Sequence, residues 1–263
     1  MMNIRKKAMV AAVLMALAAP AAAPMDLFTP AVVSAAPATE TKASDAFEVD
    51  LSKGENSLFE ASNGWTNGMP FNCFWHKENV TFEDGTLQLT IDESPNPAAD
   101  KVPYSGGEYR SKATYGYGRY EVVMKAIKND GVVSSFFTYT GPYDGDPWDE
   151  IDFEVLGKDT TKVQLNYFRN GKGGHEKMID LGFDASEDFH TYAFEWHKNS
   201  IIWFVDGKEV FRRENEDLPV TKGKIMMNAW NGKGVDEWLK AFDDTNLPLT
   251  AEYKSIKYTP FAE

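Results

Sequence analysis

The most constraining feature of this sequence is a two-residue alternation of apolar and polar side chains that recurs along the chain and is interrupted by glycine-containing turns. Residues 86–91, 120–124 and 191–196 alternate in this way, which is typical of a β-strand with one buried face. Asp206-Gly207 separates two further strand-like runs and is a strong signal for a type I′ hairpin. Many short strands joined by such turns predict an all-β fold, built as a two-sheet sandwich.

Two segments depart from strict alternation. Residues 131–139 are almost all apolar or small, as expected of a central strand that is covered on both faces. The one helix that we expect is a short one near 235–241. We see no internal repeat, and all-β domains often exceed 200 residues, so we expect one catalytic domain over 46–263, preceded by a linker at 36–45 that is rich in Ala, Pro, Thr and Ser.

The N-terminus has the pattern of a secretory signal peptide. A basic stretch at 5–7 precedes an apolar run of 12 residues at 8–19, which is too short to span a bilayer. Small residues follow, and cleavage after Ala35 is preferred to cleavage after Ala23 because Pro24 directly follows the latter. We therefore predict a signal peptide at 1–35, a secreted, extracellular protein and no membrane-spanning segment.

Composition limits the classes of partner. The formal net charge is −13, which argues against nucleic acid because phosphate binding needs clustered Lys and Arg. The chain has seven Trp and eleven Tyr, which suits stacking on flat, uncharged faces. The single cysteine, Cys73, has no partner for an internal disulfide, so we expect it to be a buried structural residue. A neutral polysaccharide fits this composition.

An acidic run at 148–157 carries the chemistry. As a strand it places Glu150, Asp152 and Glu154 on one face and the apolar residues between them on the other. Carboxylates in one row repel one another and would not stabilise a sheet, so a function in catalysis is favoured over a solvated edge.

The spacing of this row suits glycoside hydrolysis. A retaining glycosidase needs two carboxyl groups about 5–5.5 Å apart, whereas four strand residues separate the Cα atoms of Glu150 and Glu154 by roughly 13 Å. The side chains must therefore lean together across a concave sheet, which predicts a substrate cleft there. We expect the charge of Asp152 to raise the pKa of the glutamic acid that must stay protonated. Trp148 shares this face and is the best candidate for a sugar platform.

The chain from about Phe71 to Tyr258 closely resembles bacterial lichenases of glycoside hydrolase family 16. The resemblance is carried by stretches that cover most of that range and are highly specific. They are Phe71-Asn72-Cys73, Gly107-Glu108-Tyr109-Arg110, Tyr115-Gly116-Tyr117-Gly118, residues 133–142, the acidic run with its continuation to Gln164, and Lys224-Ile225-Met226-Met227-Asn228.

The resemblance implies a concanavalin-like jelly roll with a deep cleft, and an endo-glucanase that cleaves β-1,4 bonds next to β-1,3 linkages in mixed-linkage β-glucan. It implies Glu150 as nucleophile, Glu154 as general acid/base and Asp152 as assisting carboxylate. We also expect a monomer that requires no cofactor, has β-glucan as its partner and, given its acidic charge, binds neither nucleic acid nor membranes. The substrate-binding residues that the resemblance implies are Asn72, Glu108, Arg110, Phe137, Tyr139, Trp148, Asn166 and Trp230.

Some positions depart from the family pattern. Relatives often pair the cysteine after Phe-Asn with a second one just before the Gly-Glu motif, a region that reads Tyr104-Ser105-Gly106-Gly107 in this chain, so no disulfide is expected. Phe168 stands where Tyr is frequent, which removes one sugar hydrogen bond. A structural Ca²⁺ is the one metal that the resemblance suggests, and Lys254 and Ser255, in the neighbourhood that would supply its acidic ligand, count against it.

Three alternatives remain from the sequence. A xyloglucan transglycosylase carries a nearly identical acidic motif, although the stretches outside the motif resemble lichenases. A laminarinase has an extra residue before the last Glu, which would break the period of two seen here. A lectin on the same sandwich would need aromatic and amide side chains but not three clustered acids, and fold alone does not decide function.

Overall fold

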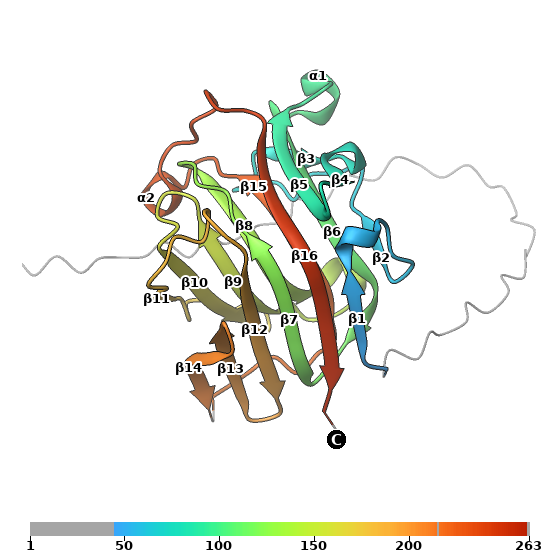
Figure 1. The fold of residues 1–263 in the computed structure, drawn as a ribbon, viewed down its shortest axis with the longest axis vertical. Coiled ribbons are helices and arrows are strands. Elements are labelled where there is room, and N and C mark those ends of the chain that lie inside the picture. The colour runs from blue at the N-terminus through green and yellow to red at the C-terminus, as the bar shows by residue number, and fades with distance from the viewer. Residues whose placement is uncertain (1–44, 215, 262–263) are drawn as a thin grey trace, which may run out of the picture. The chain divides into compact units, whose positions relative to one another are not determined.

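A computed structural model describes residues 45–214 and 216–261, so the predicted signal peptide and all of the predicted linker except Asp45 lie outside the described residues. Strands dominate this part of the chain, and its helices are short (Figure 1). In residues 45–261, apart from position 215, no helix has the length and hydropathy that a bilayer crossing would need. The strands are β1 (Phe47–Asp50), β2 (Phe59–Ala61), β3 (Cys73–Trp75), β4 (Val80–Glu83), β5 (Thr86–Glu93), β6 (Tyr104–Tyr115), β7 (Gly118–Lys125), β8 (Val132–Thr140), β9 (Asp149–Leu156), β10 (Lys162–Phe168), β11 (Lys177–Asp180), β12 (His190–His197), β13 (Ser200–Val205), β14 (Lys208–Glu214), β15 (Gly223–Asn231) and β16 (Leu249–Pro260). The helices are α1 (Pro97–Asp100) and α2 (Asp236–Leu239), with 3-10 turns η1 (Leu51–Lys53), η2 (Lys77–Asn79) and η3 (Pro142–Asp144).

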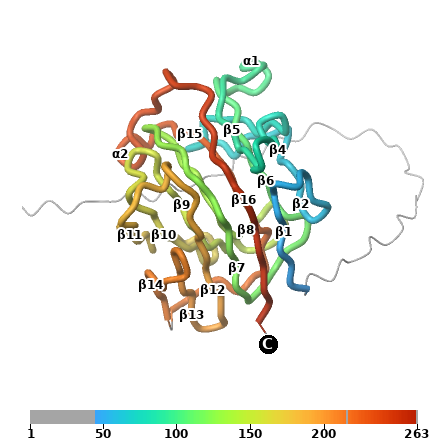
Figure 2. Tube along the Cα trace, in the orientation of Figure 1, coloured from blue at the N-terminus to red at the C-terminus, as the bar shows by residue number. Residues whose placement is uncertain are grey.

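The strands follow one hydrogen-bonded path that forms two layers. The first layer has the order β11-β10-β9-β8-β15-β6, with β2 added beside β6. The second has the order β5-β16-β7-β12-β13-β14, with β1 beside β16 and β4 beside β5. A short contact between β5 and β6 joins the layers, and Figure 2 traces β7, β16 and β1 side by side in the second. The predicted all-β, two-layer sandwich is confirmed.

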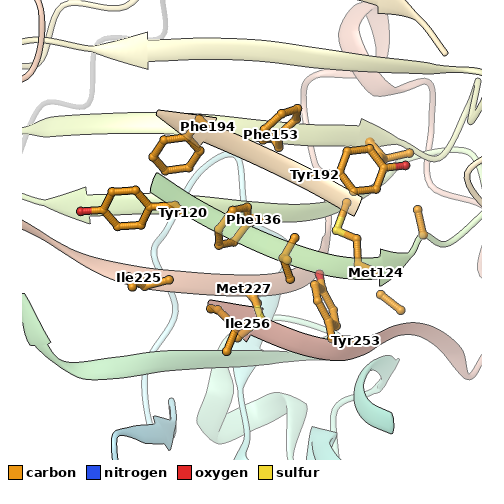
Figure 3. Packing of buried hydrophobic residues seen from close by; sticks show 14 of the residues in the cluster. Tyr120, Met124, Phe136, Phe153, Tyr192, Phe194, Ile225, Met227, Tyr253 and Ile256 are labelled. Atoms are coloured by element: carbon orange, nitrogen blue, oxygen red, sulfur yellow. The ribbon is translucent and has the colours of Figure 1, made fainter. Parts of the chain in front are cut away.

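Aromatic side chains from both layers meet in the core between them (Figure 3). Phe136 on β8 contacts Phe194 on β12, and Phe153 on β9 contacts Tyr192 on β12, each pair with ring centroids 5.6 Å apart. Burying each such ring stabilises the fold by roughly 1.5–3 kcal/mol relative to exposure. One face of β9 therefore packs into the core through Phe153, and the opposite face of the strand points away from the core.

Most of the local predictions are confirmed. The three alternating runs lie in β5, β7 and β12, and the apolar run is β8, a central strand between β9 and β15. Asp206 and Gly207 have φ values of 47° and 75° and form the two-residue turn between β13 and β14, because a type I′ turn needs positive φ at both positions. The predicted helix is α2, whereas α1 was not predicted.

Cys73 is a buried free thiol, as expected, and burial raises its pKa. Gly106 lies against it, because β3 and β6 pair in parallel. A Cβ atom added to Gly106 would lie 2.9 Å from the Cys73 sulfur, close to the spacing of about 3 Å that disulfide geometry requires. The position where relatives often have the second cysteine is therefore adjacent in space as well.

We predict that Gly106→Cys forms a disulfide with Cys73 under oxidising conditions. Closing a loop of this length stabilises by about 3–4 kcal/mol in the chain-entropy treatment, and contacts of 3.0 Å with the Ala229 carbonyl and the Trp75 ring reduce the gain. The oxidised variant should unfold about 5–10 °C above its reduced form, measured by thermal unfolding with and without dithiothreitol. Wild type and Gly106→Ser should not respond to the reductant. Two free thiols in the oxidised variant would contradict the prediction.

Candidate active site

The three predicted carboxylates lie together on one face of β9. The intervening Ile151 and Phe153 are fully buried in the core, so the even-numbered side chains point to the opposite face. The antiparallel register surrounds each carboxylate with one residue from β8 and one from β10. The cross-strand sets are Tyr139, Glu150 and Phe168; Phe137, Asp152 and Asn166; and Ser135, Glu154 and Gln164.

Glu150 is held by two donors. The indole N–H of Trp148 donates to its Oε2 at 2.5 Å, and Asp152 shares a side-chain hydrogen bond with it. The Trp148 ring stacks on Phe168, with centroids 4.5 Å apart and planes 11° apart. Trp148 thus has one ring face covered by Phe168, and its N–H group is committed to Glu150.

Glu154 has a different environment. Its Oε2 accepts a hydrogen bond of 2.7 Å from the side-chain amide of Gln164 on β10. Burial raises the pKa of Glu154 to about 8, and the negative charges of Glu150 and Glu176 act in the same direction. Burial raises the pKa of Glu150 to about 7, but the hydrogen bonds from Trp148 and Asp152 oppose that rise.

The structure corrects the prediction for Asp152. We expected its charge to raise the pKa of a neighbouring glutamic acid, but Asp152 is itself only 3% exposed. Burial first, and then the charges of Glu150 and Glu154, raise its own pKa well above the ordinary value. A buried acid between two others holds a proton most readily, so Asp152 acts as a hydrogen-bond donor to Glu150 and not as a source of charge.

This arrangement can perform acid and nucleophile chemistry on one face. Burial raises the pKa of both glutamates; two side-chain hydrogen bonds oppose that rise at Glu150, and one opposes it at Glu154. Two carboxyl groups with different donors on one strand face can take the separate roles of acid and nucleophile.

Two predicted binding residues lie on β6 in rows that continue this face. Arg110 faces Met226 and Glu108 faces Asn228 across the β6–β15 pairing. The Arg110 guanidinium pairs with Glu60 at 3.0 Å and lies 4.8 Å from the centroid of the Trp65 ring.

Glu108 is only 2% exposed. It accepts hydrogen bonds from Ser62 Oγ at 2.6 Å and Asn228 Nδ2 at 3.1 Å, and burial raises its pKa. Arg110 therefore presents a partly exposed cation, whereas the contacts of Glu108 support Asn228.

The remaining predicted residues lie deeper than the sequence indicated. Trp230 is 4% exposed and packs on Phe71, with ring centroids 4.0 Å apart. Asn72 and Asn166 are buried, and the Oδ1 atom of each has no hydrogen-bond partner among the described residues. Buried acceptors of this kind call for a ligand or water.

Three residues near the site were not predicted. Gln164 is buried beside Glu154, and its Oε1 accepts a hydrogen bond of 3.0 Å from the indole of Trp238 on α2. Asp149 begins β9 on the apolar side of the strand, where it is 2% exposed. A carboxylate in the apolar row was the signal for Asp149, whereas nothing in the local pattern singled out the other two.

The residues proposed to argue against Ca²⁺ make contacts of their own. The Lys254 ammonium lies 3.8 Å from the centroid of the Phe189 ring, and Lys125 lies 5.3 Å from the same centroid. The described residues also contain no group of three or more His, Cys, Asp or Glu side chains suited to hold a metal ion.

Comparison with known proteins finds one matching family and relatives that are described as glucanases. The sequence pattern of "Glycosyl hydrolases family 16" matches residues 67–253. A "Xylanase/beta-glucanase" of Ruminococcus flavefaciens is 58% identical over 80% of this chain, and a "Beta-glucanase" of Acetivibrio thermocellus is 55% identical over 81%. The chain spans only 26% and 62% of the length of these two proteins. A crystal structure described as a prokaryotic beta-1,3-1,4-glucanase (lichenase) from a mouse hindgut metagenome has a TM-score of 0.79 and 52% identity, covering 82% of this chain and 99% of that one.

Proposed function

The chain belongs to glycosyl hydrolases family 16, and from that premise we propose that it is a secreted endo-β-glucanase acting on mixed-linkage β-glucan. It hydrolyses the β-1,4 bond next to a β-1,3-linked unit and retains the anomeric configuration. Similarity to proteins described as a beta-glucanase and a lichenase supports this substrate class. The N-terminal basic and apolar pattern supports export.

The observation that supports the proposal is the pair of glutamates on one face of β9, of which Glu150 accepts two side-chain hydrogen bonds and Glu154 accepts one. Glu150, which receives two hydrogen bonds, is the nucleophile that attacks the anomeric carbon. Glu154, with its raised pKa, protonates the leaving oxygen and then activates water. Asp152 donates a hydrogen bond to Glu150 before the reaction. This hydrogen bond breaks as the Glu150 carboxylate forms an ester with the anomeric carbon.

The glucan lies across the rows that flank these carboxylates. The partnerless Oδ1 atoms of Asn72 and Asn166 accept hydrogen bonds from sugar hydroxyls, which explains why they have no protein partner. Arg110 donates to ring or hydroxyl oxygens, and Tyr139 and Trp148 give apolar edges beside Glu150. Glu108, Phe137 and Trp230 shape the floor on which the chain rests.

The test is product analysis on barley β-glucan, laminarin, carboxymethylcellulose and xyloglucan, with proton NMR of the first anomer released. We expect hydrolysis of the first substrate alone, with retained β configuration. Hydrolysis of laminarin or transfer onto xyloglucan would move the chain to another branch of the family. Binding of β-glucan with no cleavage would leave a lectin-like module.

A further inference from the structure

We propose that Trp238 is a positioning residue for the reaction, because its indole N–H acts through the side-chain amide of Gln164 on the carboxyl group of Glu154. This inference rests on the proposed role of Glu154. It gives a role to α2 and to the run Asp236-Glu237-Trp238, which the sequence left without chemistry.

The contacts form an unbroken chain of hydrogen bonds from α2 to β9. Trp238 Nε1 donates to Gln164 Oε1 at 3.0 Å, and Gln164 Nε2 donates to Glu154 Oε2 at 2.7 Å. Gln164 is 6% exposed and lies directly across the sheet from Glu154. The three residues come from α2, β10 and β9, so only the folded chain brings them together.

The indole decides which way the amide of Gln164 faces. A glutamine side chain can offer a neighbour either its N–H groups or its carbonyl oxygen, whereas the indole N–H of a tryptophan only donates. With Trp238 bonded to Oε1, the NH₂ group must point toward Glu154. Because Gln164 is buried, solvent does not compensate readily for a flipped amide.

Helix α2 is anchored so that the indole stays in place. Leu239 is fully buried, and its carbonyl accepts a hydrogen bond of 2.8 Å from Gly131 N. The Trp238 ring also packs near Trp230, with centroids 6.0 Å apart. The donor is therefore held by packing that does not depend on its own hydrogen bond.

The orientation matters because Glu154 must act in both protonation states. A donor aimed at the carboxyl group favours its ionised form, whereas a carbonyl aimed at it would favour the protonated form. Burial and negative neighbours already favour the proton, so a fixed donor keeps the base form accessible for the second step. The charges that act on Glu154 are those of Glu150 and Glu176, and the titratable Asp152 lies between the two glutamates. Ser135 faces Glu154 from β8, and the α2 acids Asp236 and Glu237 are exposed.

Trp238→Phe tests the relay, because it keeps an aromatic ring but removes the N–H group. We expect kcat on barley β-glucan to fall about five- to tenfold, the effect of losing one hydrogen bond between uncharged groups, with little change in KM. The alkaline limb of kcat/KM, which reports the essential acid of the free enzyme, should move to higher pH. Trp196→Phe is the matched control, because its indole donates to the Pro219 carbonyl in the core and its alkaline limb should not move.

A double-mutant cycle with Gln164→Ala separates the relay from simple packing. If Trp238 acts through Gln164, Trp238→Phe should have no further effect on kcat in the Gln164→Ala background. Additive losses, or an alkaline limb that stays in place, would overturn the relay. If wild type is active on β-glucan and Trp238→Phe has the same activity at every pH, the relay is refuted but the proposed function stands. If wild type is inactive on every β-glucan, both the relay and the proposed function are refuted.

Discussion

Glu150→Ala and Glu154→Ala should each lose more than about a thousandfold in kcat on β-glucan, since each removes a group that bonds to, or exchanges a proton with, the reacting atoms. Sodium azide should restore activity in different ways. Loss of the nucleophile opens space on the α face of the sugar, so Glu150→Ala should give an α-glycosyl azide. Loss of the acid/base still permits the glycosyl-enzyme to form from an activated aryl glycoside, so Glu154→Ala should give a β-glycosyl azide.

The anomer of each azide product, read by NMR, assigns the roles. If the two anomers are exchanged, the pair is right but the roles of nucleophile and acid/base are reversed. Glu252→Ala is a suitable control, because Glu252 pairs with Lys125 in the second layer, away from β9, and should retain activity. Full activity in both test variants would remove the carboxylate row from the chemistry altogether.

We expect Asp149→Ala to lower the free energy of unfolding strongly, because the Asp149 side chain is buried and accepts several hydrogen bonds. The carboxylate accepts hydrogen bonds from the backbone N–H groups of Asn170, Val220 and Thr221 at 2.9–3.0 Å, and pairs with Arg169 at 3.1 Å. Removing it leaves three backbone N–H groups without their acceptor and breaks the ion pair with Arg169, which keeps its hydrogen bonds to Asn170 and Asp217. Breaking a buried pair of this kind typically costs about 3–5 kcal/mol, which lowers Tm by roughly 10 °C in a domain of this size.

The pH dependence of this effect has a definite sign. Burial raises the pKa of Asp149, but its four donors outweigh burial and leave the pKa below the ordinary value. A carboxyl group whose pKa is lowered by folding stabilises the protein above its unfolded pKa of about 3.9, and that contribution is lost as pH falls through the folded pKa.

The Tm difference between wild type and Asp149→Asn should therefore be full at neutral pH and shrink below about pH 4. Asp159→Ala serves as control, because the side chains of Asp159 and Lys162 that pair with each other are 39% and 40% exposed, and such a pair should contribute about 1 kcal/mol or less. A Tm difference for Asp149→Asn that is constant from neutral pH down to pH 3 would show that charge at this position does not stabilise the fold.

Asp149 also links stability to the candidate site. It precedes Glu150, and the Asn170-Gly171 turn that it holds donates a hydrogen bond from Gly171 N to the Trp148 carbonyl. The same carboxylate thus ties the start of β9, the end of β10 and the segment before β15 around the residue that contacts Glu150. Residual activity of Asp149→Ala at low temperature should therefore be reduced as well as its Tm.

What the sequence determined by itself is the local conformation and the face that each side chain takes. Alternation with period two set Glu150, Asp152 and Glu154 on one side of β9, because successive side chains of a strand point in opposite directions. Asp206-Gly207 specified its hairpin because few residues accept positive φ. The identity of the binding residues came instead from resemblance to a family, since single aromatic and amide side chains carry no periodic signal.

Only the tertiary structure decided which atoms each carboxylate meets, and therefore which one keeps a proton. Glu154 accepts a hydrogen bond from Gln164, which is ten positions away in the chain, and Gln164 accepts one from Trp238, which is 74 positions further on. Asp152 turned out to be a buried proton donor because it lies between two acids in a desolvated row. Protonation depends on burial and on donors within hydrogen-bond reach, and both are set by strand register and packing between distant segments, which no local pattern of residues encodes.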